Sequence, residues 1–589
     1  MPSRAQPAPP ITTIERRGIE YIPLAERWGT PGGLFWMWAG AIWNVEFLVY
    51  GVLGIVVFGL SFAQAVIVIV AGNVSYLLTG LASLQGPQAG TTCFGISRAP
   101  FGPRGNRVPS LFNWVTQVGF EIEGVALIVF AAIALAGEAG LHSVPGWMKA
   151  AFLIAAVAVQ AVLPLLGHAA VLRVLKYLAL PFVVLFSIMA ALVAMKLHGS
   201  SLTSGGASWG AMTVFAALVV AAGGLGWTEN ANDYSRYLPP GTGRSRIVLA
   251  VTLGCAIPSV LLEVLGAALA ITLPASAKLS VTGLTAGFPG WFAVPYLIFA
   301  ILQLFAINTL DLYSSGVTLQ SLVPRLSRVS CVAIDTAICL CVAAYAIFSS
   351  RFYTLLSDFL LFIIVWLAPW CAIYLVDSWL RRDRYDPASL LTTTGGMYYR
   401  RGGVAWPALI AQGAGMIAAA LWLNAYSPYV GPLASRIGGT LGSDLSVLAG
   451  LLAAGGMYWL LARRRVRAEA RATPPVLVLP GQRARIEGDA DRGDLAVLDM
   501  PPVHGRHRLG ASGVQVEPGQ HVRSVHEGLA HLHLGHNLRH PLEPIDALVG
   551  VGGVAERPVK RRVVGEDRAD GVEVAAHPAV EVNGADLGG

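Results

Sequence analysis

Apolar segments long enough to cross a membrane recur twelve times between residues 33 and 463, and this repetition constrains the fold more than any other feature. A helix needs about 20 apolar residues to cross the roughly 30 Å of hydrocarbon in a bilayer. Segments of this kind lie at 33–56, 62–85, 108–135, 147–166, 169–195, 211–230, 247–272, 291–317, 329–349, 353–378, 404–425 and 443–463. The sequence therefore predicts an all-α polytopic membrane protein with twelve transmembrane helices in a lipid bilayer.

Composition and charge placement agree with this prediction. Charged residues make up 13% of the 589 residues, about half the share in a typical soluble domain. Arginine and lysine gather before the first predicted helix and after every second helix, a bias that marks cytoplasmic loops. We therefore attribute the net charge of +7 to these loops and not to a nucleic-acid partner. Both termini are expected on the cytoplasmic side of the cell membrane.

The composition changes after the last apolar segment. No Phe, Tyr or Trp follows Trp459, yet nine of the twelve histidines lie beyond Pro502. A segment of this composition has little with which to build a core. We predict a cytoplasmic N-terminal segment (1–32), a twelve-helix transporter domain (33–463) and a cytoplasmic disordered tail (464–589). Alternatively, the tail is a GC-rich reading-frame artefact.

Two predicted helices carry interruptions at matching places. The first contains Ala39-Gly40-Ala41-Ile42-Trp43-Asn44, and the sixth contains Gly223-Gly224-Leu225-Gly226-Trp227. Glycine in a membrane helix can simply permit close packing. However, breaks in the first helix of each successive group of five are typical of transporters built from inverted repeats. We predict that helices 1 and 6 are broken.

Acidic residues lie inside the apolar segments, where an unpaired charge is costly. They are Glu46, Glu121, Glu123, Glu263, Asp311 and Asp335. Each alone could be part of a structural pair. Together, without enough basic residues deep in the same segments, they indicate a polar pathway in which some carboxyls are protonated.

Several motifs resemble the nucleobase–cation symporters, the family of cytosine, purine, uracil, thiamine, allantoin and hydantoin permeases, and are closest to the purine-cytosine permeases. They are Arg17-Gly18-Ile19-Glu20, Ser97-Arg98-Ala99-Pro100-Phe101-Gly102, Asn232-Asp233-Tyr234-Ser235-Arg236-Tyr237-Leu238-Pro239, Asp311-Leu312-Tyr313-Ser314 and Val404-Ala405-Trp406-Pro407-Ala408-Leu409. The resemblance covers about residues 15–465. It implies a core of ten helices in two inverted five-helix repeats, with two additional helices.

The resemblance also implies where substrate binds, namely between helices 1, 3, 6 and 8. By motif, the expected contacts are Trp43, Gln117, Phe120, Glu121, Gly224, Gly226, Trp227 and Asp311. The Gln117 amide can donate to and accept from the edge of a base, and the Phe120 ring can stack on its face. Gln117 could instead only link neighbouring helices. Gly224 stands where the family has an aromatic residue, which Trp227 could replace.

The coupling cation is the least constrained feature. Sodium would meet the backbone oxygens of Ala39 and Ile42, but the family's hydroxyl ligands on helix 8 are replaced by Phe305, Ala306 and Ile307. Hard cations prefer a full oxygen shell, so a proton carried by Glu46, Glu121 or Asp311 is favoured.

The sequence thus predicts a permease that imports a nucleobase-like heterocycle by cation symport and alternating access, with H⁺ favoured over Na⁺. The alternatives are a sodium-coupled permease for an allantoin-, hydantoin- or thiamine-like substrate and a membrane-embedded enzyme. The apolar segments lack the histidine cluster or activated nucleophile that such enzymes use. No cofactor and no metal site are predicted.

Overall fold

The computed structural model describes residues 19–141, 143–166, 168–197, 206–273, 288–323, 325–349, 352–424, 429–437 and 442–473. Residues 1–18 and most of the predicted tail (474–589) lie outside this part of the chain. Within it the structure is helical, and the only β-type pairing is an isolated bridge between Asn424 and Val430. The predicted all-α class is confirmed.

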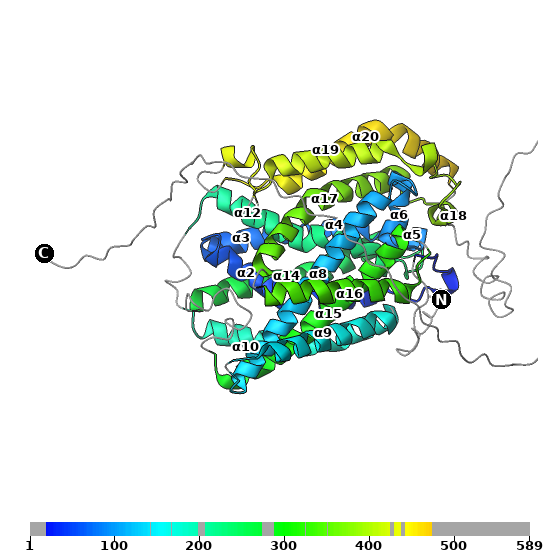
Figure 1. Ribbon diagram of the computed structural model, residues 1–589. Coiled ribbons are helices and arrows are strands. Elements are labelled where there is room, and N and C mark those ends of the chain that lie inside the picture. The colour runs from blue at the N-terminus through cyan, green and yellow to red at the C-terminus, as the bar shows by residue number, and fades with distance from the viewer. Residues whose placement is uncertain are drawn as a thin grey trace, which may run out of the picture. The chain divides into compact units, whose positions relative to one another are not determined.

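The long helices follow the predicted apolar segments (Figure 1). In chain order they are α1 (Pro31–Ile42) with α2 (Val45–Val56), α3 (Phe62–Asn73) with α4 (Tyr76–Ala82), α8 (Arg107–Glu138), α9 (Gly146–Leu166), α10 (His168–Ala194), α12 (Trp209–Val220) continued by η2 (Ala221–Leu225), η3 (Gly226–Asn230) and α13 (Ala231–Ser235), α14 (Arg244–Thr272), α15 (Gly290–Leu322), α16 (Arg328–Phe348), α17 (Phe352–Arg381), α19 (Trp406–Trp422) and α20 (Ser446–Ala472). Short helices form η1 (Leu24–Glu26), α5 (Gly86–Ala89), α6 (Cys93–Ile96), α7 (Arg98–Phe101), α18 (Pro387–Leu391), η6 (Arg401–Gly403) and η7 (Ala434–Arg436).

Nine helices in the described ranges are long and apolar enough to cross a membrane, and the bent pair α1–α2 makes a tenth. Shorter apolar stretches occupy Gly146–Val162 and Leu180–Ala194, where the fourth and fifth crossings are predicted. The chain is therefore a multi-pass membrane protein. The number twelve stays a prediction.

Both predicted helix breaks are confirmed. The axes of α1 and α2 differ by 55° across Trp43 and Asn44, and the Asn44 side chain accepts a hydrogen bond from the Glu46 amide at 3.0 Å. In the sixth span, Gly223 has φ −94° and ψ −115°, outside the helical region. Interrupted backbone at membrane depth must be enclosed by protein or line a cavity, so both breaks lie inside the bundle.

Glycines bring the first span into backbone contact with α14. A Cβ at Gly51 of α2 would overlap the carbonyl oxygen of Glu263, and a Cβ at Gly266 would overlap that of Leu48. Small residues allow membrane helices to approach this closely. Elsewhere α8 packs along α15, and α19 and α20 pack on each other and on α17 (Figure 1).

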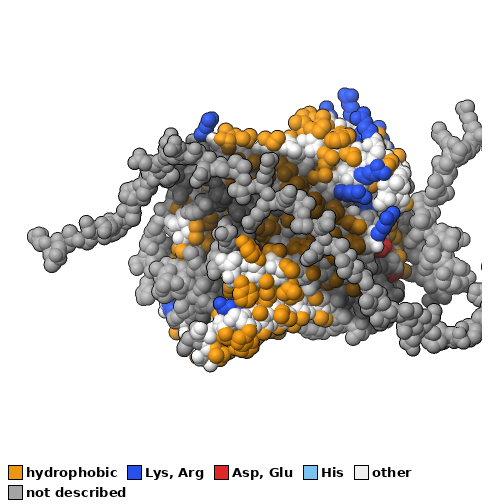
Figure 2. All heavy atoms as spheres, viewed as in Figure 1, with side chains coloured by type: hydrophobic (Ala, Val, Ile, Leu, Met, Phe, Trp, Pro, Cys, Tyr) orange, Lys and Arg blue, Asp and Glu red, His pale blue; other side chains and the backbone are white. Residues whose placement is uncertain are grey.

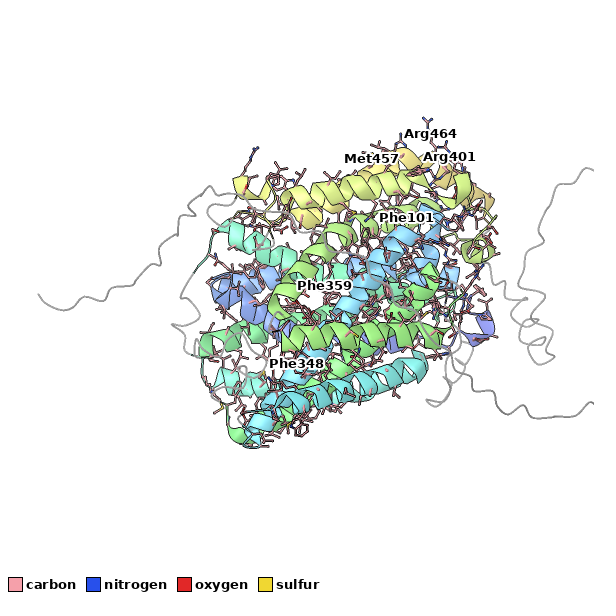
Figure 3. All side chains as sticks on the ribbon, in the orientation of Figure 1. Phe101, Phe348, Phe359, Arg401, Met457 and Arg464 are labelled. Atoms are coloured by element: carbon pink, nitrogen blue, oxygen red, sulfur yellow. The ribbon has the colours of Figure 1, made fainter. Side chains whose placement is uncertain are left out.

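The two ends of the bundle differ in charge. Figure 2 shows apolar side chains over the middle of the visible face and Lys and Arg side chains gathered mainly at one end. Arg401 and Arg464 lie at that end (Figure 3). There α20 continues to Ala472, nine residues past the predicted limit at 463. The predicted start of the tail at 464 therefore falls inside a helix.

Candidate functional site

Five acidic side chains from four spans come together in the bundle. They are Glu46 on α2, Glu121 and Glu123 on α8, Glu229 on η3 and Asp311 on α15. Asp311 lies close enough to interact electrostatically with each of the other four. The elements that carry them belong to helices 1, 3, 6 and 8, between which substrate was predicted to bind.

No basic side chain offsets this cluster in the described ranges. Arg244 pairs with Asp383, and Arg381, Arg400 and Arg465 form a group with Asp377 and Glu469. None of these ion pairs includes one of the five acids. Because buried charges must be paired or neutralised, this group of carboxyls suits bound protons, a cation or a ligand rich in hydrogen-bond donors.

Gln117 ties α8 to the break in the sixth span. Its Nε2 donates to Glu229 Oε1 at 2.5 Å and to Asn230 Oδ1 at 2.9 Å. Its Oε1 is buried without a partner. The amide nitrogen therefore links neighbouring helices, and the amide oxygen is left to accept a hydrogen bond.

Further oxygens in the site lack partners. The Glu121 carboxyl lies beside the Ser315 hydroxyl, but its two oxygens and Oε2 of Glu229 are buried without a well-formed hydrogen bond within the described residues. Buried polar atoms are nearly always hydrogen-bonded in native proteins. Together with Gln117 Oε1, they are a group of buried acceptors from two neighbouring spans.

Glu263 and Asp335, also predicted as buried acids, have neutral partners. Glu263 accepts from Asn73 Nδ2 at 2.9 Å and Ser259 Oγ at 3.0 Å. Asp335 accepts from Trp114 Nε1 at 2.7 Å and Ser315 Oγ at 2.8 Å. These hydrogen bonds explain how the two carboxyls are accommodated without a ligand.

The predicted aromatic contacts separate into two groups. Trp43 stacks on Phe186 with ring centroids 6.1 Å apart, and Trp227 meets Trp38 edge-to-face at 5.5 Å. Both belong to the same apolar cluster. Phe120 instead packs edge-to-face on Phe359 of α17, in a second cluster.

The glycines of the sixth span pack tightly against protein backbone. A Cβ at Gly224 would overlap the backbone of Ser75, and the Gly224 carbonyl accepts from Thr79 Oγ1 at 2.6 Å. A Cβ at Gly226 would lie 2.6 Å from the Ala221 oxygen. Gly224 thus faces the helix-2 segment, and a contact of either glycine with substrate stays a prediction.

The backbone positions predicted for sodium lie at the end of α1. The Ala39 carbonyl accepts from the Trp43 amide at 3.1 Å, and Ile42 is the last residue of the helix. On α15, Phe305, Ala306 and Ile307 offer no side-chain oxygen.

Two polar residues come next on α15. Thr309 Oγ1 donates to the Phe305 carbonyl at 2.6 Å, and Asn308 Nδ2 donates to Gln160 at 2.9 Å and to the Glu121 carbonyl at 3.3 Å. Sequence reasoning missed Asn308 and Glu229 as members of the site. The position of Glu229 three residues after a glycine-rich break was the signal for it.

The chain matches the model of a family described as permeases for cytosine/purines, uracil, thiamine and allantoin, over residues 21–441. It belongs to this family. It is 29% identical over 466 residues to a putative purine-cytosine permease, YxlA, of Bacillus subtilis, an alignment that covers 78% of this chain and 98% of that protein. It is 27% identical to the purine-cytosine permease fcyB of Emericella nidulans, with 62% and 73% of the chains covered.

The fold is that of Mhp1, a nucleobase-cation-symport-1 family transporter. The structure of Mhp1 in a closed conformation with bromovinylhydantoin bound superposes with a TM-score of 0.62 at 20% identity, covering 78% of this chain and 96% of Mhp1. The inward-facing conformation of Mhp1 gives a TM-score of 0.58. This match supports the two inverted repeats with broken helices 1 and 6. Since its relatives are permeases, the chain is a transporter and not an enzyme.

Proposed function

We propose that this permease imports a nucleobase or related planar heterocycle of the cytosine and purine class, by symport with protons. The convergence of Glu46, Glu121, Glu123 and Glu229 on Asp311 carries the proposal. A carboxyl accepts a hydrogen bond when ionised and can also donate when protonated. A site of this kind can change its preference for a base when a proton binds or leaves.

The acceptors left unpaired fit the edge of a base. Gln117 Oε1, Glu229 Oε2 and the Glu121 carboxyl oxygens would accept from ring N–H groups and exocyclic amines. Trp43 and Trp227, which lie in one apolar cluster, would hold the faces of the ring, and Phe120 would contact it after a rotation away from Phe359. Residues 305–307 of α15 supply no hydroxyl for sodium, and this favours the proton.

The basic end of the bundle is proposed to face the cytoplasm, with both termini on that side of the cell membrane. The support is the excess of Lys and Arg at that end (Figure 2). A C-terminal epitope tag reached by antibody only in inside-out vesicles supports this orientation, and labelling of intact cells contradicts it.

Uptake into proteoliposomes tests substrate and coupling together. Radiolabelled cytosine, adenine and hypoxanthine are supplied with choline in place of sodium, and a pH gradient, acidic outside, is then imposed. We expect concentrative uptake that rises with the gradient and collapses with a protonophore. Competition by uracil, allantoin, hydantoin and thiamine ranks the substrate classes. Uptake that requires sodium and ignores the pH gradient would show the proton proposal to be wrong.

Asp311→Asn is the companion variant because it keeps the shape of the side chain and removes its titration. We expect the variant to lose gradient-driven accumulation while it retains substrate binding. Glu263→Gln is the matched control, since Glu263 is a buried carboxyl with its own partners, Asn73 and Ser259. If Asp311→Asn still follows the pH gradient, coupling resides on another acid of the cluster.

A further inference from the structure

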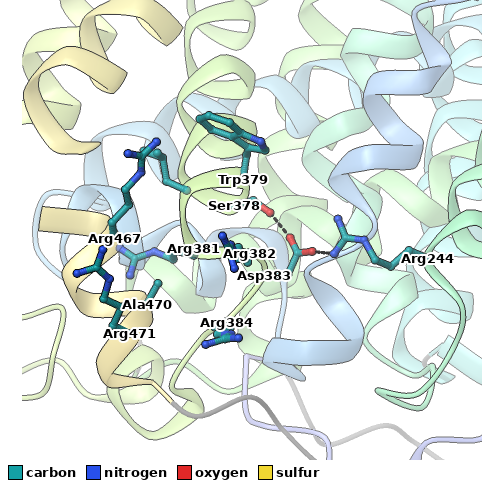
Figure 4. Close-up of a pocket in the computed structure, with 11 residues that line it drawn as sticks. Arg244, Ser378, Trp379, Arg381, Arg382, Asp383, Arg384, Arg467, Ala470 and Arg471 are labelled. Atoms are coloured by element: carbon teal, nitrogen blue, oxygen red, sulfur yellow. Dashed lines mark hydrogen bonds and ion pairs between the residues drawn. The ribbon is translucent and has the colours of Figure 1, made fainter. Parts of the chain in front are cut away.

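Arginines surround a hollow at the basic end of the bundle, away from the acidic site. The hollow has a volume of about 720 Å³ and is formed by the ends of α17 and α20 and the start of α14 (Figure 4). Its arginines are Arg244, Arg381, Arg382, Arg384, Arg467 and Arg471, and Asp383 is its only acidic lining residue.

Only two of these six arginines form ion pairs with acidic side chains within the described residues. Asp383 forms an ion pair with Arg244. Arg381 is balanced by Asp377 at 2.7 Å and Glu469 at 2.8 Å. The other four arginines, Arg382, Arg384, Arg467 and Arg471, form no ion pair in the described part of the chain.

The turn that closes the hollow is held in an unusual conformation. Arg382 and Asp383 both have φ of 55°, a left-handed conformation that residues other than glycine rarely adopt. Asp383 is buried and accepts a hydrogen bond from Ser378. These contacts hold Arg382 and Arg384 beside the hollow at the cost of backbone strain.

One buried donor at the hollow is unsatisfied. Arg381 is fully buried, and although its Nε and Nη2 are paired, its Nη1 has no hydrogen-bond partner. Arg381 lines the hollow, and its Nη1, which is closed off from solvent as the structure stands, would gain an acceptor if an oxyanion drew the guanidinium toward the hollow. The positive-inside bias requires only basic residues in cytoplasmic loops, and does not explain their convergence on a hollow with an orphan guanidinium nitrogen.

The surroundings place this hollow at the level of lipid headgroups. Trp379 lines it and is 64% exposed, as is typical of the aromatic residues at a membrane–water interface. On α20, Leu460 and Leu461 are exposed one to two turns before Arg464 and Arg467. The arginines therefore lie where apolar, lipid-facing surface gives way to water.

We propose that this hollow binds the phosphate headgroup of an anionic membrane lipid, such as cardiolipin or phosphatidylglycerol. Basic pockets between spans bind such headgroups by charge, and arginine pairs with phosphate oxygens in a two-pronged geometry. The site is separate from the acidic cluster, so it does not depend on which substrate is carried.

Lipid retention by the full-length protein tests the proposal. The detergent-solubilised permease is titrated with cardiolipin, phosphatidylglycerol or phosphatidylcholine, and bound lipid is counted by native mass spectrometry. We expect the anionic lipids to bind at least about tenfold more tightly than phosphatidylcholine. We expect this preference to be lost when Arg382, Arg384, Arg467 and Arg471 are all changed to Gln. Equal retention of phosphatidylcholine by the unaltered protein overturns the proposal.

The control variant removes the same charge elsewhere, with Gln at Arg107, Arg246, Arg325 and Arg401, all exposed and outside the hollow. If this control loses the preference for anionic lipids to the same extent, the assignment of the lipid site to the hollow is wrong. In a separate arm inorganic phosphate is added to the lipid-bound protein. Displacement of the lipid by millimolar phosphate would show that the hollow binds a free anion and would overturn the lipid proposal. If the fourfold variant does not fold, the exposed pair Arg467→Gln and Arg471→Gln is used, for which unchanged lipid retention also overturns the proposal.

Discussion

At the scale of single residues, Gln117 is the most informative side chain to change. Gln117→Ala removes the donor to Glu229 and Asn230 and a buried acceptor that has no hydrogen-bond partner among the described residues. A ligand edge left without its partner loses about 1–3 kcal/mol. We expect the substrate affinity to fall by roughly 5- to 150-fold, measured by thermal shift or by uptake competition.

Gln412→Ala is the control for this substitution. Gln412 is also a buried glutamine whose Nε2 donates across helices, to the Trp366 carbonyl at 2.9 Å, but it lies on α19. The substrate affinity of Gln412→Ala should be unchanged. Equal affinities in the two variants would remove Gln117 from the binding site.

Individual acids were predictable because a carboxyl stands out in an apolar run, as Glu121 and Asp311 do. Their partners were not predictable. Gln117 and Glu229 are 112 residues apart, and only the packing of α8 on the broken sixth span brings them together. The same limit applies to Phe120, whose neighbour Phe359 comes from α17.

At the scale of elements, the contact between α2 and α14 makes a sharp prediction. Gly51→Ala would place a methyl group on the Glu263 carbonyl oxygen. Because this oxygen belongs to the backbone of a helix, it cannot turn aside as a flexible side chain could. We expect the stability of the purified protein to fall by about 1–3 kcal/mol, detected as a lower melting temperature in detergent. Gly456→Ala on α20 is the control, because a Cβ there meets nothing within 4 Å, and its melting temperature should not fall. An equal fall in melting temperature for the two variants would contradict the packing argument.

The spans and their breaks could be predicted because the hydropathy of a segment and its glycines can be read from neighbouring residues alone. The position at which α20 ends could not be predicted in this way. Its last turns, Arg464-Arg465-Val466-Arg467-Ala468-Glu469-Ala470-Arg471-Ala472, are too polar to read as membrane-spanning. Alanine, arginine and glutamate nevertheless favour helix, and the buried pair between Glu469 and Arg381 anchors the extension to α17.

At the scale of the whole molecule, two truncations separate the transporter from the C-terminal residues. A chain ending at Thr473 keeps all of α20 and should transport normally. A chain ending at Arg467 loses Glu469, which pairs with the buried Arg381 at 2.8 Å. Breaking a buried pair costs about 3–5 kcal/mol, so this shorter chain should be markedly less stable in thermal melts. Equal stability of the two chains would show that the Glu469 pair is dispensable.

The glycine contacts between α2 and α14 also bear on how such a permease changes state. With carbonyl oxygens seated against glycines on both helices, sliding of one past the other would drive backbone into backbone. These two helices must therefore travel together as one rigid unit. Gly254 of α14 is seated against the Phe35 backbone of α1 in the same way, so we expect the whole first span to move with α14.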